Sequence, residues 1–168
     1  MSPAKRRYWL AKTEPTSFSW DDLWSAKGRR TCWDGVRNYQ ARNFIRDEIK
    51  KGDLVLLYHS NAKPAGAVGI AEVVKESYVD HTQFDPQDHH FDPKSKPENP
   101  SWLMFDIKAR NKLPEFVGLP ALKENPRLGE MLVVQRGQRL SIQPVTPAEW
   151  KEVLKMGGLS GADVAKLS

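Results

Sequence analysis

Residues 54–59 (LVLLYH) limit the possible folds of this chain more than any other segment. The run is too continuously apolar for a strand with one solvated face, so it predicts a central strand covered on both faces. Residues 65–76 predict a second strand, in which Gly66 and Gly69 permit a bulge or a close backbone approach. The middle of the chain is therefore expected to form a sheet.

Helices are predicted toward the two ends of the chain. Ser19, with Asp22 three residues later, is expected to cap a short helix through Trp24. Asn38 is expected to cap a longer helix with apolar residues at a 3.6-residue period, which stops at Gly52. Both helices precede the apolar run.

The remaining segments complete the predicted order of elements. Strands are expected at 8–11, 102–112 and 132–142, a brief helix at 119–124, and a last helix after Thr146. Strands in mid-chain with helices at the ends favour an α+β fold with a mixed, barrel-like sheet over an alternating parallel one.

Size and composition favour one globular domain, since the 168 residues are 39% apolar and 28% charged. Cys32 is the only cysteine, so an intrachain disulfide is impossible and a reducing, cytoplasmic setting is expected. The sequence has no run of about 18 apolar residues and no apolar signal core, so no membrane association is expected.

We expect a single domain over 7–157, preceded by a short basic tail at 1–6 and followed by a C-terminal tail at 158–168. Residues 80–100 hold four prolines and many Asp, His and Lys residues, which predicts a long connection. Its Asp and His side chains could ligate zinc or iron, but they show no established ligand spacing. No metal ion and no cofactor are therefore expected.

Positive charge gathers in the first third of the chain. Residues 1–51 carry 12 Lys or Arg against 6 Asp or Glu, while the remainder carries 14 against 15. Such asymmetry favours an anionic partner, and the alternative is a solvated basic face without one.

Residues 31–43 (TCWDGVRNYQARN) combine an aromatic plane, a flexible glycine, two arginines and several amide side chains. Trp33 can stack on a planar ligand, and Arg37 and Arg42 can neutralise phosphates. The alternative for Trp33 is burial in the core, but its polar neighbours Asp34 and Gly35 argue against apolar surroundings. The segment therefore predicts nucleic-acid recognition.

The chain resembles the EVE domain, a member of the PUA-like superfamily. Several motifs carry the resemblance in order: YWLAKTEP at 8–15, WDGVRNYQARN at 33–43, GDLVLLYHS at 52–60, VGIA at 68–71 and RLSIQPV at 139–145. Together they span roughly residues 7–156. The resemblance implies a PUA-like β-barrel of about five to six strands flanked by helices.

The resemblance also implies a pocket between the first strand, the tryptophan turn and the central strands. The EVE domain is similar to YTH readers of methylated adenine, which hold the base in an aromatic cage. By that analogy Trp33 is one wall, and Thr13 and Glu14 lie where the base edge is read. Near Ile107, where the second tryptophan of the reader would fall, this chain has an aliphatic residue. A slot for a planar modified base is therefore expected instead of a two-tryptophan cage.

Two sets of candidate site residues follow. A carboxylate accepts hydrogen bonds only, so Glu14 suits the exocyclic amine of a cytosine-type or adenine-type base; its alternative is a surface role in a turn. Other residues expected at the base site are Trp33, Thr13, Lys12, Asp34, Asn38, Tyr58, Ser60 and Asn61. The residues expected to bind phosphate are Arg37, Arg42 and Arg46, whose alternative is a solvated helix face. No catalytic residue is predicted, because His59 lacks an activated nucleophile beside it and Cys32 has no identifiable partners.

The favoured hypothesis is a monomeric, non-enzymatic module that binds DNA or RNA through a modified, unstacked base. An enzyme acting on nucleotides or RNA, through Cys32 or the Asp/His loop, is a second hypothesis. A protein-interaction adaptor, whose basic surface meets an acidic partner, is a third. The sequence offers no coherent set of acid, base and nucleophile, and this favours the first hypothesis.

Overall fold

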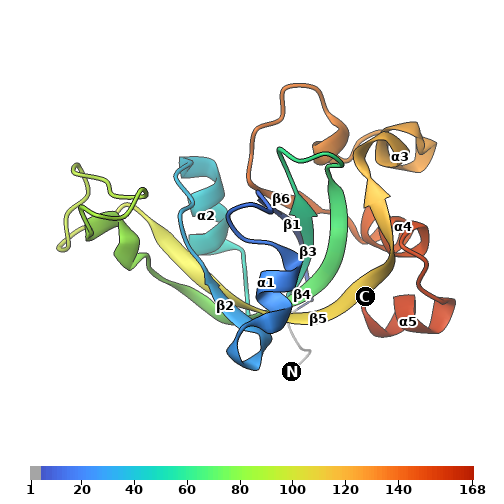
Figure 1. The fold of residues 1–168 in the computed structure, drawn as a ribbon, viewed down its shortest axis with the longest axis horizontal. Helices are drawn as coiled ribbons and strands as arrows, with labels where there is room; N and C mark the ends of the chain where they lie inside the picture. Colours follow the sequence, from blue (N-terminus) through green and yellow to red (C-terminus); the bar gives the residue numbers. More distant parts are fainter. Residues whose placement is uncertain (1–4) are drawn as a thin grey trace.

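The computed structural model describes residues 5–168, and its centre is one six-stranded sheet in the order β2-β5-β4-β3-β1-β6 (Figure 1). The strands are β1 (Tyr8–Thr13), β2 (Arg30–Trp33), β3 (Leu54–His59), β4 (Gly66–Val79), β5 (Leu103–Gly118) and β6 (Ile142–Val145). The predicted strands at the start and middle of the chain are confirmed, whereas β2 was not expected. Of residues 1–6, expected to be a tail, 1–4 lie outside the described residues.

The sheet is mixed but open. β1 runs parallel to β3 and antiparallel to β6, and the other neighbouring strands pair antiparallel. β2 and β6 form the two edges and do not pair with each other. The α+β class and the expected mixed sheet of about five to six strands are confirmed, although this sheet is curved and open instead of closed into a barrel.

Each face of the sheet carries its own hydrophobic cluster. Successive side chains of a strand point to opposite faces, so Val55 and Leu57 of β3 enter the first cluster while Leu54 and Leu56 enter the second. All four side chains are at most 2% exposed. The prediction of a central strand covered on both faces is confirmed.

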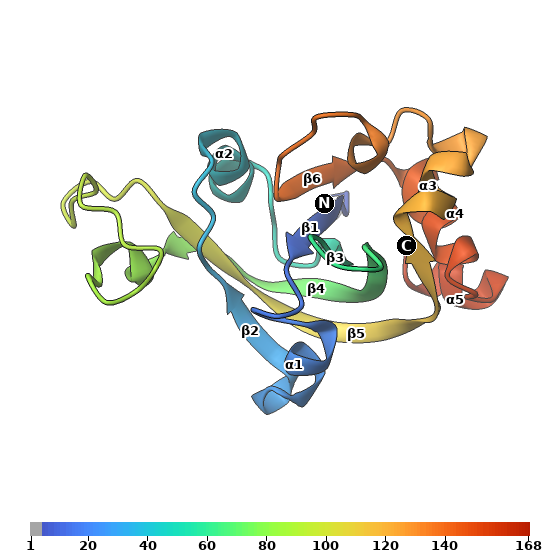
Figure 2. The same ribbon diagram turned by 45° about the horizontal axis from the view of Figure 1, so that its top comes forward.

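The described part of the chain forms five α-helices around the sheet: α1 (Trp20–Ser25), α2 (Tyr39–Asp47), α3 (Leu119–Glu124), α4 (Pro147–Met156) and α5 (Gly161–Lys166). Ser19 and Thr146 form capping boxes at α1 and α4, and the Asn38 side chain accepts the Ala41 amide at the start of α2. In both views α3, α4 and α5 gather at one end of the sheet, away from the 80–102 connection (Figures 1 and 2).

Three local expectations were wrong. Residues 132–142 contain a 3-10 turn at Leu132–Val134 and only the first residue of β6, because Val133 packs into the second cluster instead of pairing with a strand. α2 ends at Asp47, before the glycine expected to stop it. The expected tail at 158–168 contains α5, which buries Val164, and the Trp150 indole donates to the Leu167 carbonyl at 2.8 Å. No helix in the described part of the chain is long and apolar enough to cross a membrane.

His59 is a neutral structural acceptor, and this makes stability depend on pH. Its Nε2 accepts the Trp20 amide at 3.1 Å. Burial, together with Lys112, lowers the pKa of His59, and Asp21 opposes this effect. Because the unfolded chain then binds more protons, the free energy of unfolding should fall as the pH drops below about 6.5, the ordinary histidine value.

Chemical denaturation at pH 8 and pH 5.5 measures this dependence. His59→Gln keeps an acceptor that does not titrate, so its loss of stability between the two pH values should be smaller than that of the wild type. His59→Ala leaves a buried amide unpaired and should cost about 1–3 kcal/mol at pH 8. Equal pH dependence in wild type and His59→Gln would contradict the assignment.

Candidate nucleic-acid interface

A cavity of about 600 Å³ lies at the carboxyl end of β1, beside the end of β2. We call it the Trp33 cavity. Its walls come from Lys12, Thr13, Glu14, Ser17, Phe18, Thr31, Cys32, Trp33, Asp34, Gly35, Val36, Asp88, His89, His90 and Ser141. Its volume is in the range of small-ligand sites. It unites five of the nine predicted base-site residues: Lys12, Thr13, Glu14, Trp33 and Asp34.

Trp33 belongs both to the cavity wall and to the core. It is 8% exposed, lies in the first hydrophobic cluster and meets the Phe18 ring edge-on at a centroid distance of 6.3 Å. The expectation that polar neighbours keep Trp33 out of apolar surroundings was wrong, because Trp33 pairs with Phe105 on the neighbouring strand β5. Ile107, two residues further along β5, is fully buried and does not line the cavity.

The β1 turn presents an exposed carboxylate at the cavity mouth. The Thr13 hydroxyl donates to the Phe18 carbonyl at 2.7 Å, and the Phe18 amide donates to the Glu14 carbonyl at 2.9 Å. These bonds fix the turn. One Glu14 oxygen accepts the Asn61 side-chain amide at 3.2 Å. Because a carboxylate has two oxygens and several acceptor positions, Glu14 can still accept a bond from a ligand donor.

Arg37 clamps the 80–90 segment onto the tryptophan turn. Its five N–H donors make five bonds: two to the His90 carbonyl and one each to Asp80, Thr82 and the Val36 carbonyl. A guanidinium has five donors, so none remains for a phosphate. The expected phosphate-binding role of Arg37 was wrong for this reason.

The other two predicted phosphate ligands are also engaged. Arg42 donates to the Ser101 carbonyl at 2.7 Å and to Asn43, and Arg46 makes a two-bond exposed pair with Asp47. Asp47 therefore interrupts the expected basic helix face. Asn38, expected at the base site, is the cap of α2 and does not line the cavity.

The predicted base-site residues Tyr58, Ser60 and Asn61 line a separate cavity of about 540 Å³, which we call the Tyr58 cavity. Lys12 lines both cavities. The other walls are Ala65, Leu119, Lys123 and residues 133–138. The predicted site is therefore two adjacent cavities instead of one.

The Trp33 cavity contains a thiol and imidazole side chains, the kinds of group that act in catalysis, but the thiol is not activated. Burial raises the pKa of the Cys32 thiol, and Asp34, Asp106 and Asp80 raise it further. A thiol held protonated is a poor nucleophile. Potential ligand atoms of Asp88, His89 and His90, which belong to the Asp/His loop considered as a metal site from the sequence, lie within 4.8 Å of one another.

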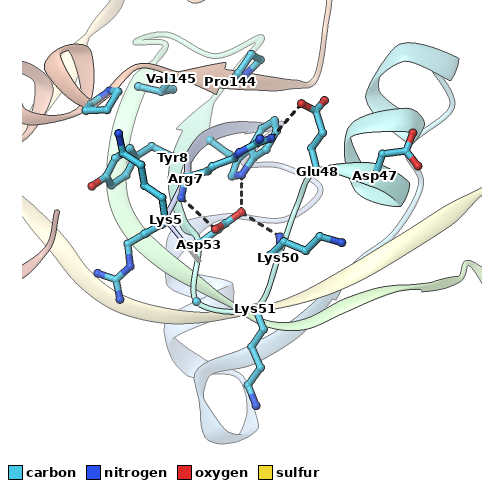
Figure 3. A pocket seen from close by; sticks show the side chains of 14 residues that line it. Lys5, Arg7, Tyr8, Asp47, Glu48, Lys50, Lys51, Asp53, Pro144 and Val145 are labelled. Atoms are coloured by element: carbon cyan, nitrogen blue, oxygen red, sulfur yellow. Dashed lines mark hydrogen bonds and ion pairs between the residues drawn. The ribbon is translucent and has the colours of Figure 1, made fainter. Parts of the chain in front are cut away.

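A third cavity, of about 810 Å³, lies at the other end of β1 (Figure 3). Five cations and three carboxylates line it: Lys5, Arg6, Arg7, Lys50, Lys51, Asp47, Glu48 and Asp53. Asp53 is buried and accepts the Arg7 and Lys50 amides and the Trp9 indole N–H, while Arg7 pairs with Glu48 at 3.0 Å (Figure 3). These bonds hold the start of β1 against the segment that leads into β3.

The open mixed sheet, with two polar cavities at the carboxyl end of its parallel pair, defines an α+β domain. The chain belongs to the EVE domain family, whose family model matches residues 7–156. Human thymocyte nuclear protein 1 is 43% identical over 166 residues, covering 89% of this chain and 73% of that relative.

Solved structures agree with this assignment. The crystal structure of human THYN1 protein in complex with 5-methylcytosine-containing DNA is 41% identical, with a TM-score of 0.86 over 92% of this chain and 99% of that one. The YTH domain of the Zygosaccharomyces rouxii MRB1 protein, in complex with N6-methyladenosine RNA, is 16% identical with a TM-score of 0.53. The second likeness is one of fold alone.

Proposed function

We propose that this protein is a non-enzymatic module that binds nucleic acid by taking a modified cytosine into the Trp33 cavity. The first candidate for this base is 5-methylcytosine. The observation that carries the proposal is the likeness, over almost the whole chain, to a human protein crystallised with 5-methylcytosine DNA. The cavity supports it, because an aromatic wall and an exposed acceptor line the same space.

In this proposal Trp33 and Phe18 supply the apolar contact with the base plane, and Glu14 accepts the cytosine N4 amine. Stacking on an aromatic side chain contributes about 1–3 kcal/mol per base and favours no particular sequence. Selectivity among bases must therefore come from hydrogen bonds to the base edge, where the Glu14 carboxylate can accept a hydrogen bond but cannot donate one. The protonated Cys32 thiol and the structural role of His59 support binding without catalysis.

Thymine is the matched ligand that tests the edge-reading role, because it carries the same 5-methyl group as 5-methylcytosine but an oxygen at position 4. Wild-type protein should bind an oligonucleotide with a central 5-methylcytosine about tenfold more tightly than its thymine counterpart, given about 1–3 kcal/mol for a good base-edge contact. Glu14→Gln should reduce that preference to threefold or less, measured by calorimetric titration.

Ser17→Ala is the control, since Ser17 lines the same cavity but is not assigned to the base edge. It should keep the preference. If Glu14→Gln discriminates between the two oligonucleotides as the wild type does, Glu14 does not read the base. If the wild type binds neither, the proposed function is wrong.

A further inference from the structure

The arginines that the sequence assigned to phosphate all bond groups of the protein itself, which raises the question of what holds the nucleic-acid backbone beside a bound base. Arg37 has no donor left, Arg42 bonds the Ser101 carbonyl, and Arg46 pairs with Asp47. Backbone contacts supply most of the affinity of proteins for nucleic acid. A reader without them would bind a free base and an oligonucleotide equally well.

The Tyr58 cavity has the composition of an anion site. Three of its lining residues are cations, Lys12, Lys123 and Arg136, and none of its lining residues is Asp or Glu. None of the ion pairs formed within residues 5–168 includes one of these three cations. The cavity at the other end of β1 differs, since three carboxylates accompany its five cations.

Lys12 joins this cavity to the Trp33 cavity. It is half-buried near the end of β1, and burial lowers the pKa of its ammonium group. A lysine removed from water without an acidic partner is stabilised by an incoming anion. The Asn61–Glu14 hydrogen bond links the walls of the two cavities at a second point.

We infer that the Tyr58 cavity holds the phosphodiester and the adjoining nucleotide next to the base bound in the Trp33 cavity. Lys12 contacts the phosphate between the two nucleotides, and Lys123 and Arg136 contact the next one. Gln138 and Ser60 supply further polar groups, and Tyr58 supplies an aromatic wall. This inference rests on the proposed function, because it places the second nucleotide relative to a base in the Trp33 cavity.

A series of ligands of increasing length tests the contributions of the two cavities to binding separately. The probes are 5-methyl-2′-deoxycytidine, its 5′-monophosphate, and a single-stranded pentanucleotide with a central 5-methylcytosine. For the wild type, affinity should rise at least tenfold from the nucleoside to the pentanucleotide. Lys123→Glu with Arg136→Glu should remove most of that gain and leave nucleoside affinity unchanged. The slope of log K against log salt for the pentanucleotide should become shallower by about 0.7, the value for one lost phosphate contact with a single strand.

The matched control is Lys5→Glu with Lys51→Glu, which changes the net charge equally at the cavity shown in Figure 3. It should keep at least half of the gain at 0.15 M salt, where fields beyond about 8 Å are screened. An equal loss in the control would overturn the inference in favour of general electrostatic attraction. Unchanged pentanucleotide affinity in Lys123→Glu with Arg136→Glu would also overturn it.

The nucleoside distinguishes this inference from the proposed function. If the wild type binds the nucleoside but its affinity does not rise with a longer ligand, the base site in the Trp33 cavity is supported and the assignment of the Tyr58 cavity is wrong. If the nucleoside and the pentanucleotide both fail to bind, both proposals fall. Lys12→Met should weaken the monophosphate and the pentanucleotide more than it weakens the nucleoside, because Lys12 lines both cavities.

Discussion

Replacing Asp80 by alanine is expected to lower the free energy of unfolding by about 3–5 kcal/mol, the range for breaking a buried ion pair from one side. The Asp80 carboxylate is fully buried, pairs with Arg37 at 2.9 Å and accepts the Gly35 amide at 2.9 Å. It also accepts the amide and hydroxyl of Thr82. The variant leaves these donors and the Arg37 charge without their acceptor. For a domain of this size the midpoint of thermal unfolding should drop by about 10 °C.

Asp80→Asn and Arg46→Ala serve as comparisons. Asp80→Asn loses the charge and one of the two acceptor oxygens but keeps the other, so it should be less destabilising than Asp80→Ala. Arg46→Ala removes an exposed pair and should leave the unfolding midpoint unchanged, because exposed pairs contribute little. Thermal and chemical denaturation of the three variants measures the order. A midpoint for Asp80→Ala equal to that of Arg46→Ala would contradict the clamp.

The same carboxylate should contribute to acid unfolding. Burial opposes ionisation of Asp80, but hydrogen bonds from Thr82, Arg37 and Gly35 outweigh it and lower the pKa of the carboxyl group. A lowered folded pKa gives stability that is complete above the ordinary value near 4 and is lost as the pH falls through the folded value.

Elements with strong local signals were predicted correctly from the sequence. Ser19, Asn38 and Thr146 cap their helices through bonds to residues three positions away, so the signal and its partner lie in one short window. The central strand β3 was predictable because both of its faces are apolar. These features depend on neighbours in the sequence.

Elements stabilised by distant partners were missed or misread. β2 has only four residues and is held by pairing with β5, more than 70 residues away. Arg37 was expected to be free because the sequence does not reveal Asp80, which lies 43 positions away. The two cavities could not be told apart either, since residues 133–138 of the Tyr58 cavity come from a segment predicted as strand.

Within the Trp33 cavity, the residue types were predictable but the balance between packing and binding was not. Trp33 was expected as one wall of a base site; it lines the cavity and also fills the first hydrophobic cluster. Its substitution must therefore change stability and affinity together, and an experiment has to separate the two.

Trp33→Ala is expected to weaken binding of the 5-methylcytosine oligonucleotide by one to two orders of magnitude, from the loss of about 1–3 kcal/mol of stacking. It should also lower the free energy of unfolding by about 3–5 kcal/mol, since removing a buried tryptophan leaves a cavity. Trp33→Phe restores an aromatic plane of smaller area and should recover part of both losses. Titration calorimetry and chemical denaturation measure the two effects.

Phe105→Leu is the variant that separates stability from binding. Phe105 is 1% exposed, pairs with Trp33 across the sheet and does not line the cavity. It should lower stability while the folded protein keeps its affinity for the oligonucleotide. If Phe105→Leu weakens binding as much as Trp33→Ala does, the loss in Trp33→Ala reflects unfolding instead of stacking. If Trp33→Ala binds like the wild type below its unfolding midpoint, the tryptophan belongs to the core alone and the base must lie elsewhere.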